Sequence, residues 1–421
     1  MLAIRKKILS SDYFKSVFRL TMGSLIAQLI TALVSPISTR LYTPEQLAVY
    51  TLIITVSAMF GPVLCGKYDM AIVSAKDEKE VTNLIVGGLA VSAITIILVT
   101  IGYRFYLQTK PEIIDEVGIF AYLLVLILVV NALIHLLNRY NNRHKEYKLI
   151  SSVYVFRTGF QNIGLVLFGF LKLGSLGLLL SQILGSLVGL KRQSKRLIEN
   201  RDMFKNVKLN EVKDTLLKYK KLPIYSMPAH FLNSASYSML NFFITGLFGL
   251  GTLGYYSITY RILGIPLTLV SLNVSKVFFQ RASEEKNNTG GYRRTLMQLT
   301  LFLACLSIPM VLVLITLGPF LFELFFGAGW GVAGRYAQIL APMYGLRFIV
   351  SALTPALVIS GEQRLELVLQ SLFIITSVIS YFVCRWTGYG INTFLLFITA
   401  FYSAIYALLY IVIFKLSKKR Q

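Results

Sequence analysis

The chain has 421 residues, of which 55% are hydrophobic and 14% are charged, and its formal net charge at pH 7 is +23. The charged residues lie between long apolar runs, and stretches such as Val117 to Val130 and Leu299 to Leu317 contain none. This pattern excludes an ordinary soluble protein and predicts an all-α polytopic membrane protein. No nucleic-acid-binding motif accompanies the positive charge, so we expect no nucleic acid as a partner.

About twelve membrane spans are expected along the chain. The basic segment Met1 to Lys15 precedes a hydrophobic run from about Val17 to Ser38 that lacks a small-residue cleavage site, which predicts a retained first helix. Hydropathy predicts six spans in each half. Those of the first half are 17–39, 46–66, 84–106, 118–138, 149–170 and 174–190. Those of the second half are 222–248, 253–278, 296–317, 333–357, 366–384 and 391–414.

The distribution of Lys and Arg predicts the orientation of these spans. Most basic residues fall in the loops that share one side with both termini, and eleven of them lie in the loop 191–221. We therefore expect a multi-pass membrane protein with both termini in the cytoplasm. The portion 208–221 is compatible with an amphipathic helix on anionic headgroups. The simpler alternative is that the loop only fixes topology and joins the two halves.

An internal repeat predicts how the spans are grouped. The segment Thr39 to Thr51 (TRLYTPEQLAVYT) aligns with Thr245 to Ser257 (TGLFGLGTLGYYS) at a constant offset. Both segments join an odd-numbered span to the next, so we expect two six-helix lobes related by a pseudo-two-fold axis along the membrane normal. The expected domains are an N-terminal lobe over 1–190, a basic cytoplasmic linker over 191–221 and a C-terminal lobe over 222–421.

Polar residues recur on one face of the first and seventh spans, at steps of three and four. The two stripes are Ser24, Gln28, Thr31, Ser35 and Ser38, and Ser226, His230, Asn233, Tyr237, Asn241 and Thr245. Because polar groups are costly in lipid, we expect these faces to line a watery cavity. The candidate substrate contacts on them are Gln28, His230, Asn233 and Asn241. Hydrogen bonding between helices is the alternative, and it is at least as strong for His135 and His230.

Arginines are the charged residues expected deepest in the membrane. Arg157, Arg261 and Arg347 fall inside predicted spans, where no carboxylate is expected at comparable depth, and Arg40 lies at the outer end of the first span. A guanidinium group stays protonated and binds phosphate or carboxylate oxygens as a planar fork. The four residues therefore predict a binding path for an anionic cargo. The alternative is that each arginine fixes helix packing by binding a carbonyl group.

Other candidate sites are few. Asp69, near the inner end of the second span, is a candidate gating residue that either pairs with an arginine or caps a helix. Cys65, Cys305 and Cys384 have no metal-ligand spacing, so we expect no metal site. No phosphate-binding loop is present, and direct use of ATP is not expected. We predict no catalytic residue and no cofactor.

Several segments, taken in order, resemble a known family. They are Arg40–Tyr50 (RLYTPEQLAVY), Lys67–Val73 (KYDMAIV), Tyr260–Leu267 (YRILGIPL), Val277–Ser283 (VFFQRAS), Phe326–Trp330 (FGAGW) and Ala337–Pro342 (AQILAP). Over most of the chain they resemble the polysaccharide-export branch of the multidrug/oligosaccharidyl-lipid/polysaccharide (MOP) superfamily. The members of that branch are the Wzx-type flippases of O-antigen and capsule repeat units.

The resemblance implies both a fold and a function. It implies two six-helix lobes around a V-shaped cationic cavity that opens alternately to the two sides. The implied cargo is an undecaprenyl-pyrophosphate-linked oligosaccharide, moved from the cytoplasmic to the periplasmic leaflet for O-antigen or other surface polysaccharide biosynthesis. The implied partners are this lipid-linked substrate, membrane lipids, and a polysaccharide polymerase with its chain-length regulator.

Two other classes of function remain open. A drug/cation antiporter of the same fold would be expected to carry a buried Asp or Glu. A membrane polysaccharide polymerase or lipid-sugar transferase would be expected to present a large outer loop, or carboxylates and histidines clustered at one membrane face. The longest outer loop, 107–116, is short, and the three histidines are scattered, so the transporter is favoured over the enzyme.

Overall fold

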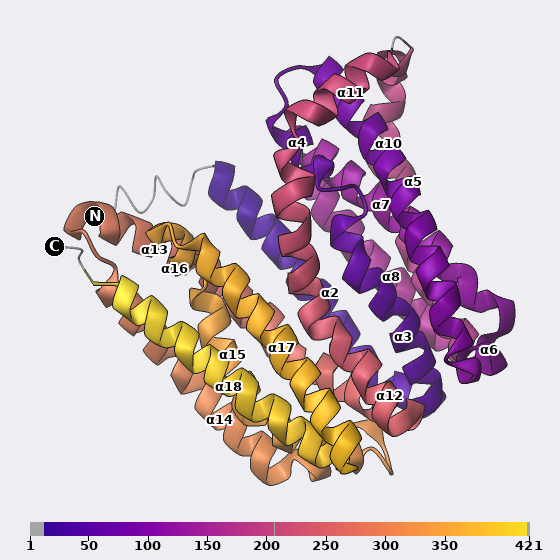
Figure 1. Cartoon of the computed structure of the whole chain (residues 1–421), viewed down its shortest axis with the longest axis vertical. Coiled ribbons are helices and arrows are strands. Elements are labelled where there is room, and N and C mark those ends of the chain that lie inside the picture. Colours follow the sequence, from indigo (N-terminus) through magenta and orange to yellow (C-terminus); the bar gives the residue numbers. More distant parts are fainter. Residues whose placement is uncertain (1–11, 206, 419–421) are drawn as a thin grey trace. The chain divides into compact units, whose positions relative to one another are not determined.

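The computed structural model describes residues 12–205 and 207–418, and over these ranges it contains helices and no strand (Figure 1). The predicted all-α fold is confirmed. The helices of the first half are α2 (Asp12–Leu41), α3 (Pro44–Phe60), α4 (Tyr68–Ser74), α5 (Glu78–Gln108), α6 (Pro111–Val117), α7 (Leu123–Arg143), α8 (Tyr147–Phe170), α9 (Gly174–Leu187), α10 (Leu190–Glu199) and α11 (Leu209–Lys218). Those of the second half are α12 (Met227–Pro266), α13 (Leu272–Thr289), α14 (Arg293–Phe326), α15 (Gly331–Leu353), α16 (Pro355–Ser360), α17 (Gln363–Thr387) and α18 (Ile391–Leu416).

Ten helical stretches of the described chain are long and apolar enough to cross a membrane. One of them, Leu222–Thr289, has 68 residues and is interrupted at Gly249, where the backbone leaves the helical region with φ 82° and ψ 176°. This break divides the stretch into the expected seventh and eighth spans. The expected fifth span corresponds to α8, which has 24 residues, contains Arg157 and is not among the ten. Together these helices account for the twelve expected spans.

Contacts divide the chain into two compact units, each with its own packing. The first unit comprises Met1–Val34 and Val49–Ser234, and the second comprises Ser35–Ala48 and Ala235–Gln421. The end of α2 and the start of α3 thus belong with the second unit, and the linker helices α10 and α11 belong with the first. The expected lobe boundaries at 190 and 222 stay a prediction.

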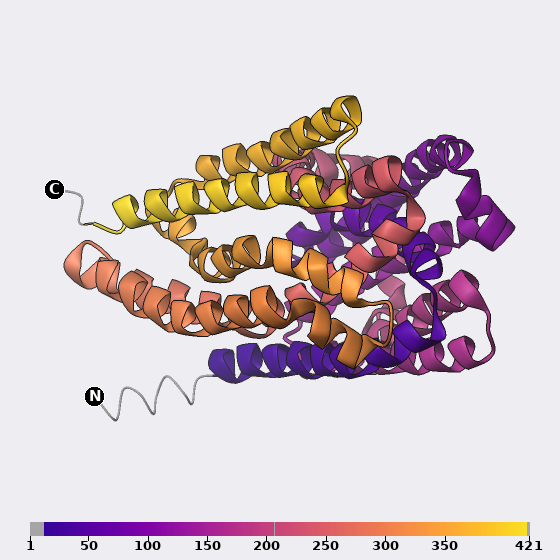
Figure 2. The same cartoon turned by 90° about the horizontal axis from the view of Figure 1, so that it is seen from below.

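Small residues set the helix packing in each unit. In the second unit α14 lies along α15, and α15 lies against α18 (Figure 2). A Cβ atom added to Gly334 of α15 would lie 2.5 Å from the carbonyl oxygen of Gly318 on α14, so only glycine fits here. In the first unit α8 and α9 pack closely, and a Cβ atom at Gly185 would lie 2.8 Å from the Arg157 carbonyl oxygen. Such close approach of backbones is the usual basis of helix association in membranes.

The repeated segment 39–51 contains a helix start that follows from its sequence. Thr43 precedes Pro44, the first residue of α3, where a missing N–H costs nothing. The Thr43 N–H donates to Gln46 Oε1 at 3.2 Å, and the Gln46 N–H donates to Thr43 Oγ1 at 3.3 Å. This reciprocal capping satisfies two backbone donors that the helix leaves unpaired. The adjoining residue Pro44 packs directly on Gly254 of α12 within the second unit.

Two π-helical turns interrupt the second half of the chain. They are Leu222–Ser226, which contains Pro223, and Leu267–Ser271, which directly follows Pro266. Proline has no N–H and cannot accommodate the carbonyl group of the preceding turn. A wider turn at the same place lets the neighbouring backbone groups find other partners.

Gly254→Ala is expected to destabilise the protein, because the new Cβ atom would overlap the Pro44 carbonyl group. Overpacking of this kind costs about 1–3 kcal/mol. Gly264→Ala, on the same helix with no atom within 4 Å of the added Cβ, is the matched control and should leave the melting temperature unchanged or raise it. Thermal unfolding of both purified variants in detergent measures the difference. Equal melting temperatures would show that α12 does not need this close approach.

Candidate functional site

Arg347 on α15 lies at the centre of an aromatic cluster in the second unit. Its guanidinium carbon Cζ is 4.2 Å from the centroid of the Tyr237 ring and 5.4 Å from that of the Tyr344 ring. Both distances are typical of cation–π contacts. Among the described residues no Asp or Glu forms an ion pair with Arg347. The positive charge is therefore stabilised by ring faces and is not neutralised by a carboxylate.

The tyrosines around Arg347 are held by hydrogen bonds from three other helices. The hydroxyl groups of Tyr237 on α12 and Tyr406 on α18 are 2.7 Å apart. Tyr402 of α18 lies 2.7 Å from the Ser377 hydroxyl of α17 and donates to the Ser236 carbonyl at 3.2 Å. We refer to Arg347, Tyr237, Tyr344, Tyr402 and Tyr406 as the Arg347–tyrosine cluster. Its hydrogen bonds fix the rings before any ligand arrives.

Three other predicted site residues belong to the same unit. Arg261 is half-buried on α12 and directly follows Tyr260, whose ring lies 6.5 Å from the Tyr344 ring. Asn241 is also half-buried on α12, one turn beyond Tyr237. Arg40 is exposed in the last turn of α2. Tyr237 and Tyr260 thus place α12 beside Arg347 and Tyr344. A role of Arg261 and Asn241 at the Arg347–tyrosine cluster stays a prediction, and Arg40 lies at a helix end.

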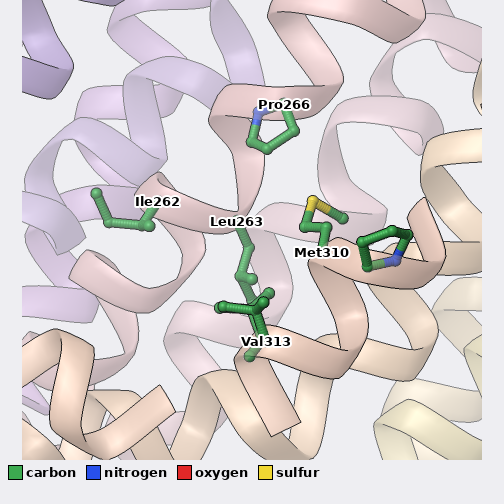
Figure 3. Close-up of a pocket in the computed structure, with 7 residues that line it drawn as sticks. Ile262, Leu263, Pro266, Met310 and Val313 are labelled. Atoms are coloured by element: carbon green, nitrogen blue, oxygen red, sulfur yellow. The ribbon is translucent and has the colours of Figure 1, made fainter. Parts of the chain in front are cut away.

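An apolar pocket of about 320 Å³ is lined in part by Ile262, the residue that follows Arg261 in the sequence (Figure 3). Ile262, Leu263 and Pro266 line it from α12, and Met310 and Val313 line it from α14. Pro266 carries no N–H group, and the other side chains are hydrocarbon or thioether groups. A pocket with this lining offers little to a polar ligand and suits a hydrocarbon chain.

Arg157 occupies a different environment in the first unit. Its Nε donates to the Val188 carbonyl at 3.0 Å, and its Nη2 donates to Gln193 Oε1 at 2.8 Å. The Gln193 amide in turn donates to Asn138 Oδ1 at 2.8 Å. These contacts join α8 to α7, to the end of α9 and to α10, and they favour the packing alternative for Arg157. The cavity expected to be shared by Arg157, Arg261 and Arg347 stays a prediction.

The remaining polar candidates also lie in the first unit. Gln28 is half-buried on α2, whereas His230 and Asn233 are exposed near the start of α12. Exposure leaves these two side chains accessible, but the described structure assigns them no ligand. Their role in substrate binding stays a prediction.

Asp69 is the second residue of α4 and lies in a charged cluster, close to the irregular segment that joins α3 to α4. Its carboxylate is 3.2 Å from Nε of Arg139 on α7, and the Asp69 side chain is only 6% exposed. Lys67, two residues earlier, has a left-handed backbone with φ 63° and donates to the Pro62 carbonyl at 3.1 Å. Burial lowers the pKa of the Lys67 ammonium group. Asp69 was expected either to pair with an arginine or to cap a helix, and the structure shows the pairing, with Arg139.

Sequence reasoning missed two parts of this cluster. Arg139 was expected only as a loop residue, and its partner lies 70 positions away in the chain. Asp69 was expected at a membrane edge and is in fact buried, so the chain does contain a buried carboxylate. The signal available in the sequence was the pair of opposite charges in Lys67-Tyr-Asp69.

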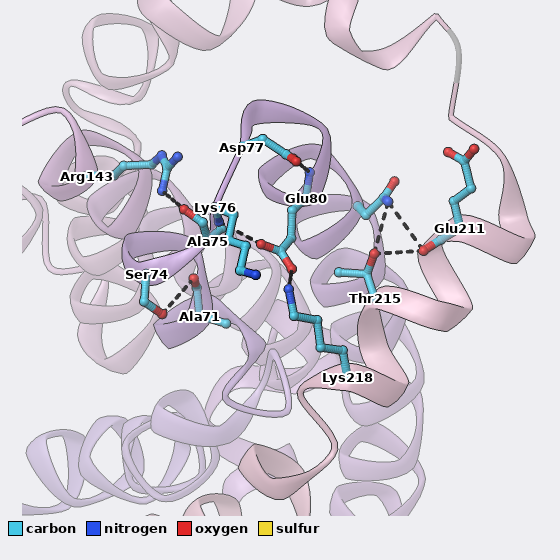
Figure 4. Close-up of polar contacts among 11 residues, drawn as sticks. Ala71, Ser74, Ala75, Lys76, Asp77, Glu80, Arg143, Glu211, Thr215 and Lys218 are labelled. Atoms are coloured by element: carbon cyan, nitrogen blue, oxygen red, sulfur yellow. Dashed lines mark hydrogen bonds and ion pairs between the residues drawn. The ribbon is translucent and has the colours of Figure 1, made fainter.

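The linker helix α11 packs on the first turns of α5 (Figure 4). Asn83 donates to the Glu211 carbonyl at 3.3 Å and to Thr215 Oγ1 at 3.0 Å. Lys218 contacts Glu80, and this hydrogen bond raises the pKa of Lys218. The Glu80 carboxylate also accepts a hydrogen bond from the Lys76 N–H at 2.7 Å, which ties the first turn of α5 to the residues that precede it. Most of the portion 208–221 is thus a helix, Leu209–Lys218, that packs on the rest of the first unit, and its lipid contact stays a prediction.

Comparison with known proteins identifies the wider group. Residues 76–334 match the model of a family described as polysaccharide biosynthesis protein, which is more than half of the chain. No curated protein sequence matches the chain.

Solved structures share the fold at low sequence identity. An inward-facing multidrug resistance MATE family transporter of the MOP superfamily is 16% identical, with 96% of this chain and 100% of that chain covered and a TM-score of 0.69. The lipid II flippase MurJ, in an inward closed conformation, is 15% identical, with 96% and 87% covered and a TM-score of 0.69. A MOP superfamily transporter from Pyrococcus furiosus, described as having a binding pocket of reverse polarity, is 16% identical, with 98% of each chain covered and a TM-score of 0.65. These likenesses confirm the predicted MOP-like fold.

Asp69→Ala is expected to destabilise the protein by about 2 kcal/mol, because it leaves the Arg139 charge without its partner. The double variant Asp69→Ala with Arg139→Ala should recover part of this loss. Glu78→Ala is the control, since it breaks the more exposed pair with Arg143 and should change stability by less than about 0.5 kcal/mol. Chemical or thermal unfolding in detergent measures all three. An additive double variant would show that Asp69 and Arg139 are not energetically coupled.

Proposed function

The chain belongs to the polysaccharide biosynthesis protein family, and on that premise we propose that it is a flippase for lipid-linked oligosaccharides. It would move undecaprenyl-pyrophosphate-linked repeat units from the cytoplasmic to the periplasmic leaflet by alternating access. The observation that carries this proposal is the Arg347–tyrosine cluster, in which a half-buried arginine meets aromatic rings and, in the described part of the chain, no carboxylate partner.

The chemistry of this cluster suits both polar parts of such a cargo. A guanidinium group that no carboxylate neutralises attracts an anion and can bind phosphate oxygens in two places. Tyrosine rings offer flat apolar faces for the apolar face of a sugar, and their hydroxyl groups can exchange hydrogen bonds with sugar hydroxyls. Arg261, next to Tyr260 on α12, would provide a second cation.

The apolar pocket after Arg261 suits the remaining part of the cargo. An isoprenoid chain carries no polar group, and the lining by Ile262, Leu263 and Met310 matches it. A pyrophosphate attached to a polyprenyl chain needs a cationic group next to an apolar site. Arg261, followed in the sequence by residues of the apolar pocket, would provide both. We therefore assign the second unit the main role in cargo recognition.

The cellular setting forms part of the same proposal. The protein is a multi-pass membrane protein, and we place it in the bacterial inner membrane with both termini in the cytoplasm. Its lobes would extend over 1–190 and 222–421 around the basic linker 191–221. A polysaccharide polymerase and a chain-length regulator would act on the exported repeat unit. The enzyme alternative has no observation in its favour.

The drug/cation antiporter is the second candidate, because Asp69 is a buried carboxylate. Its neighbours argue against this role. Asp69 is already paired with Arg139, and Lys67 lies close by, so the local charge is positive on balance. A cationic drug would be repelled by this environment.

Arg347→Ala and Arg261→Ala are each expected to abolish the surface polysaccharide, because the cargo phosphates lose their charged partners. The corresponding lysine variants should restore export only partly, since lysine keeps the charge and loses the planar fork. Export is measured as surface polysaccharide in cells that depend on the plasmid-borne protein.

Arg335→Ala serves as the matched control, because Arg335 is an exposed arginine on the same helix α15 as Arg347. It should leave export unchanged. Immunoblots of the membrane fraction establish that all variants are present in equal amounts. Normal export by both Arg261→Ala and Arg347→Ala would remove these arginines from the mechanism.

The membrane potential is expected to contribute to export, because the proposed cargo is anionic and the cell interior is negative. Each net elementary charge that crosses the field gains about 2.3 kcal/mol per 100 mV. In proteoliposomes that carry the lipid-linked substrate, an imposed inside-negative potential should accelerate transfer from the leaflet that corresponds to the cytoplasmic side. An unchanged rate, together with a strong response to a pH or sodium gradient alone, would favour ion-coupled antiport.

A further inference from the structure

A second pocket, of about 430 Å³, lies in the first unit where α7 ends, α8 begins and α10 passes. Four basic residues and two carboxylates line it: Lys148, Arg192, Lys195, Arg196, Glu146 and Glu199. Arg196 is 3.5 Å from Glu146, and Lys195 is 3.8 Å from Glu199. Lys148 and Arg192 have no ion pair within the described ranges 12–205 and 207–418. The pocket therefore keeps two positive charges that no protein group neutralises.

The start of α8 adds to this positive potential. Lys148 and Leu149 are the second and third residues of this 24-residue helix, and both line the pocket. Backbone N–H groups at these positions have no partner within the helix. Glu146, the residue before the helix, makes no side-chain capping hydrogen bond to them. A helix start of this kind favours an anion, and here basic side chains surround it.

Asn141, which also lines the pocket, has a side-chain acceptor without a hydrogen-bond partner among the described residues. The residue is 1% exposed, and its Nδ2 donates to the carbonyl groups of Leu137 at 2.8 Å and Gln193 at 3.0 Å. These two bonds require the amide nitrogen and so fix the orientation of the side chain. Its Oδ1 is buried and has no hydrogen-bond partner. A buried acceptor without a donor is unfavourable, and a ligand hydroxyl group would satisfy it.

We infer that this pocket binds the phosphoglycerol headgroup of an anionic phospholipid. The phosphodiester lies against Lys148, Arg192 and the start of α8, and a glycerol hydroxyl donates to Asn141 Oδ1. The acyl chains enter the bilayer beside α8, the expected fifth span, which begins at the pocket. Basic pockets at the ends of membrane helices bind lipid headgroups in this way. The bound lipid is not the proposed cargo, so this site does not depend on the identity of that cargo.

Lipid retention by the full-length protein tests the inference. The protein is purified in detergent, mixed with phosphatidylglycerol, phosphatidylmethanol or phosphatidylcholine, and analysed by native mass spectrometry. Phosphatidylglycerol should be retained most, and phosphatidylmethanol, which has the same charge and no hydroxyl group, should be retained less. The double variant Lys148→Gln with Arg192→Gln should reduce retention of phosphatidylglycerol about tenfold.

The control is the double variant Lys213→Gln with Lys220→Gln, which removes two exposed lysines outside the pocket. It should keep retention within about twofold of the parent protein, because neither lysine lines the pocket. Should the pocket double variant fail to fold, Arg192→Gln alone carries the same comparison, since Arg192 is exposed on α10.

Three results would overturn the inference. If the pocket and control double variants lost equal amounts of phosphatidylglycerol retention, the loss would be due to general surface charge and not to this pocket. Equal retention of phosphatidylglycerol and phosphatidylmethanol would remove the hydroxyl contact at Asn141. Stabilisation by soluble glycerol phosphate, lost in the pocket variant and accompanied by no lipid retention, would assign the pocket to a soluble phosphate ester.

Discussion

The bilayer core contains no water, so the backbone polar groups of the spans have to find their partners within the chain, and the helical structure follows from that requirement. Many hydroxyl groups in the spans bond to their own helix, as Thr55 does to the Thr51 carbonyl and Thr95 to the Val91 carbonyl. Such residues add polarity to a helix face without any need for a cavity. A polar stripe in the sequence is therefore weak evidence for a water-filled path, and charged side chains are stronger evidence.

The two units satisfy their arginines differently. In the first unit Arg157 and Arg139 bind groups of the protein itself, a carbonyl and an amide oxygen for one and a carboxylate for the other. In the second unit Arg347 is surrounded by tyrosine rings. A charge that already has strong protein partners has less to gain from a ligand anion than one held only by ring faces. The residue type alone could not distinguish these cases, because it does not reveal the partner.

Much of the fold could be predicted because the hydropathy of successive residues indicates which segments lie in the lipid bilayer. The expected spans depend on neighbours in the chain, and the sequence displays such neighbours directly. The partners of Arg157 and Asp69 could not be predicted, because Gln193 was assigned to a cytoplasmic linker and Arg139 to a loop. Contacts between residues tens of positions apart are decided by packing. The same holds for Asn141, whose unpaired oxygen becomes apparent only when its neighbours are counted.

The π-helical turns at Leu222–Ser226 and Leu267–Ser271 have a consequence for how this chain varies among its relatives. A π turn contains one residue more than the α-helical turn it replaces, and that residue rotates every later side chain by about 100° around the helix axis. Evolution can therefore gain or lose a single residue at these turns without breaking the helix. A relative that lacks one residue there would present a different face of the following segment, so its equivalent polar positions would be shifted by one in the alignment.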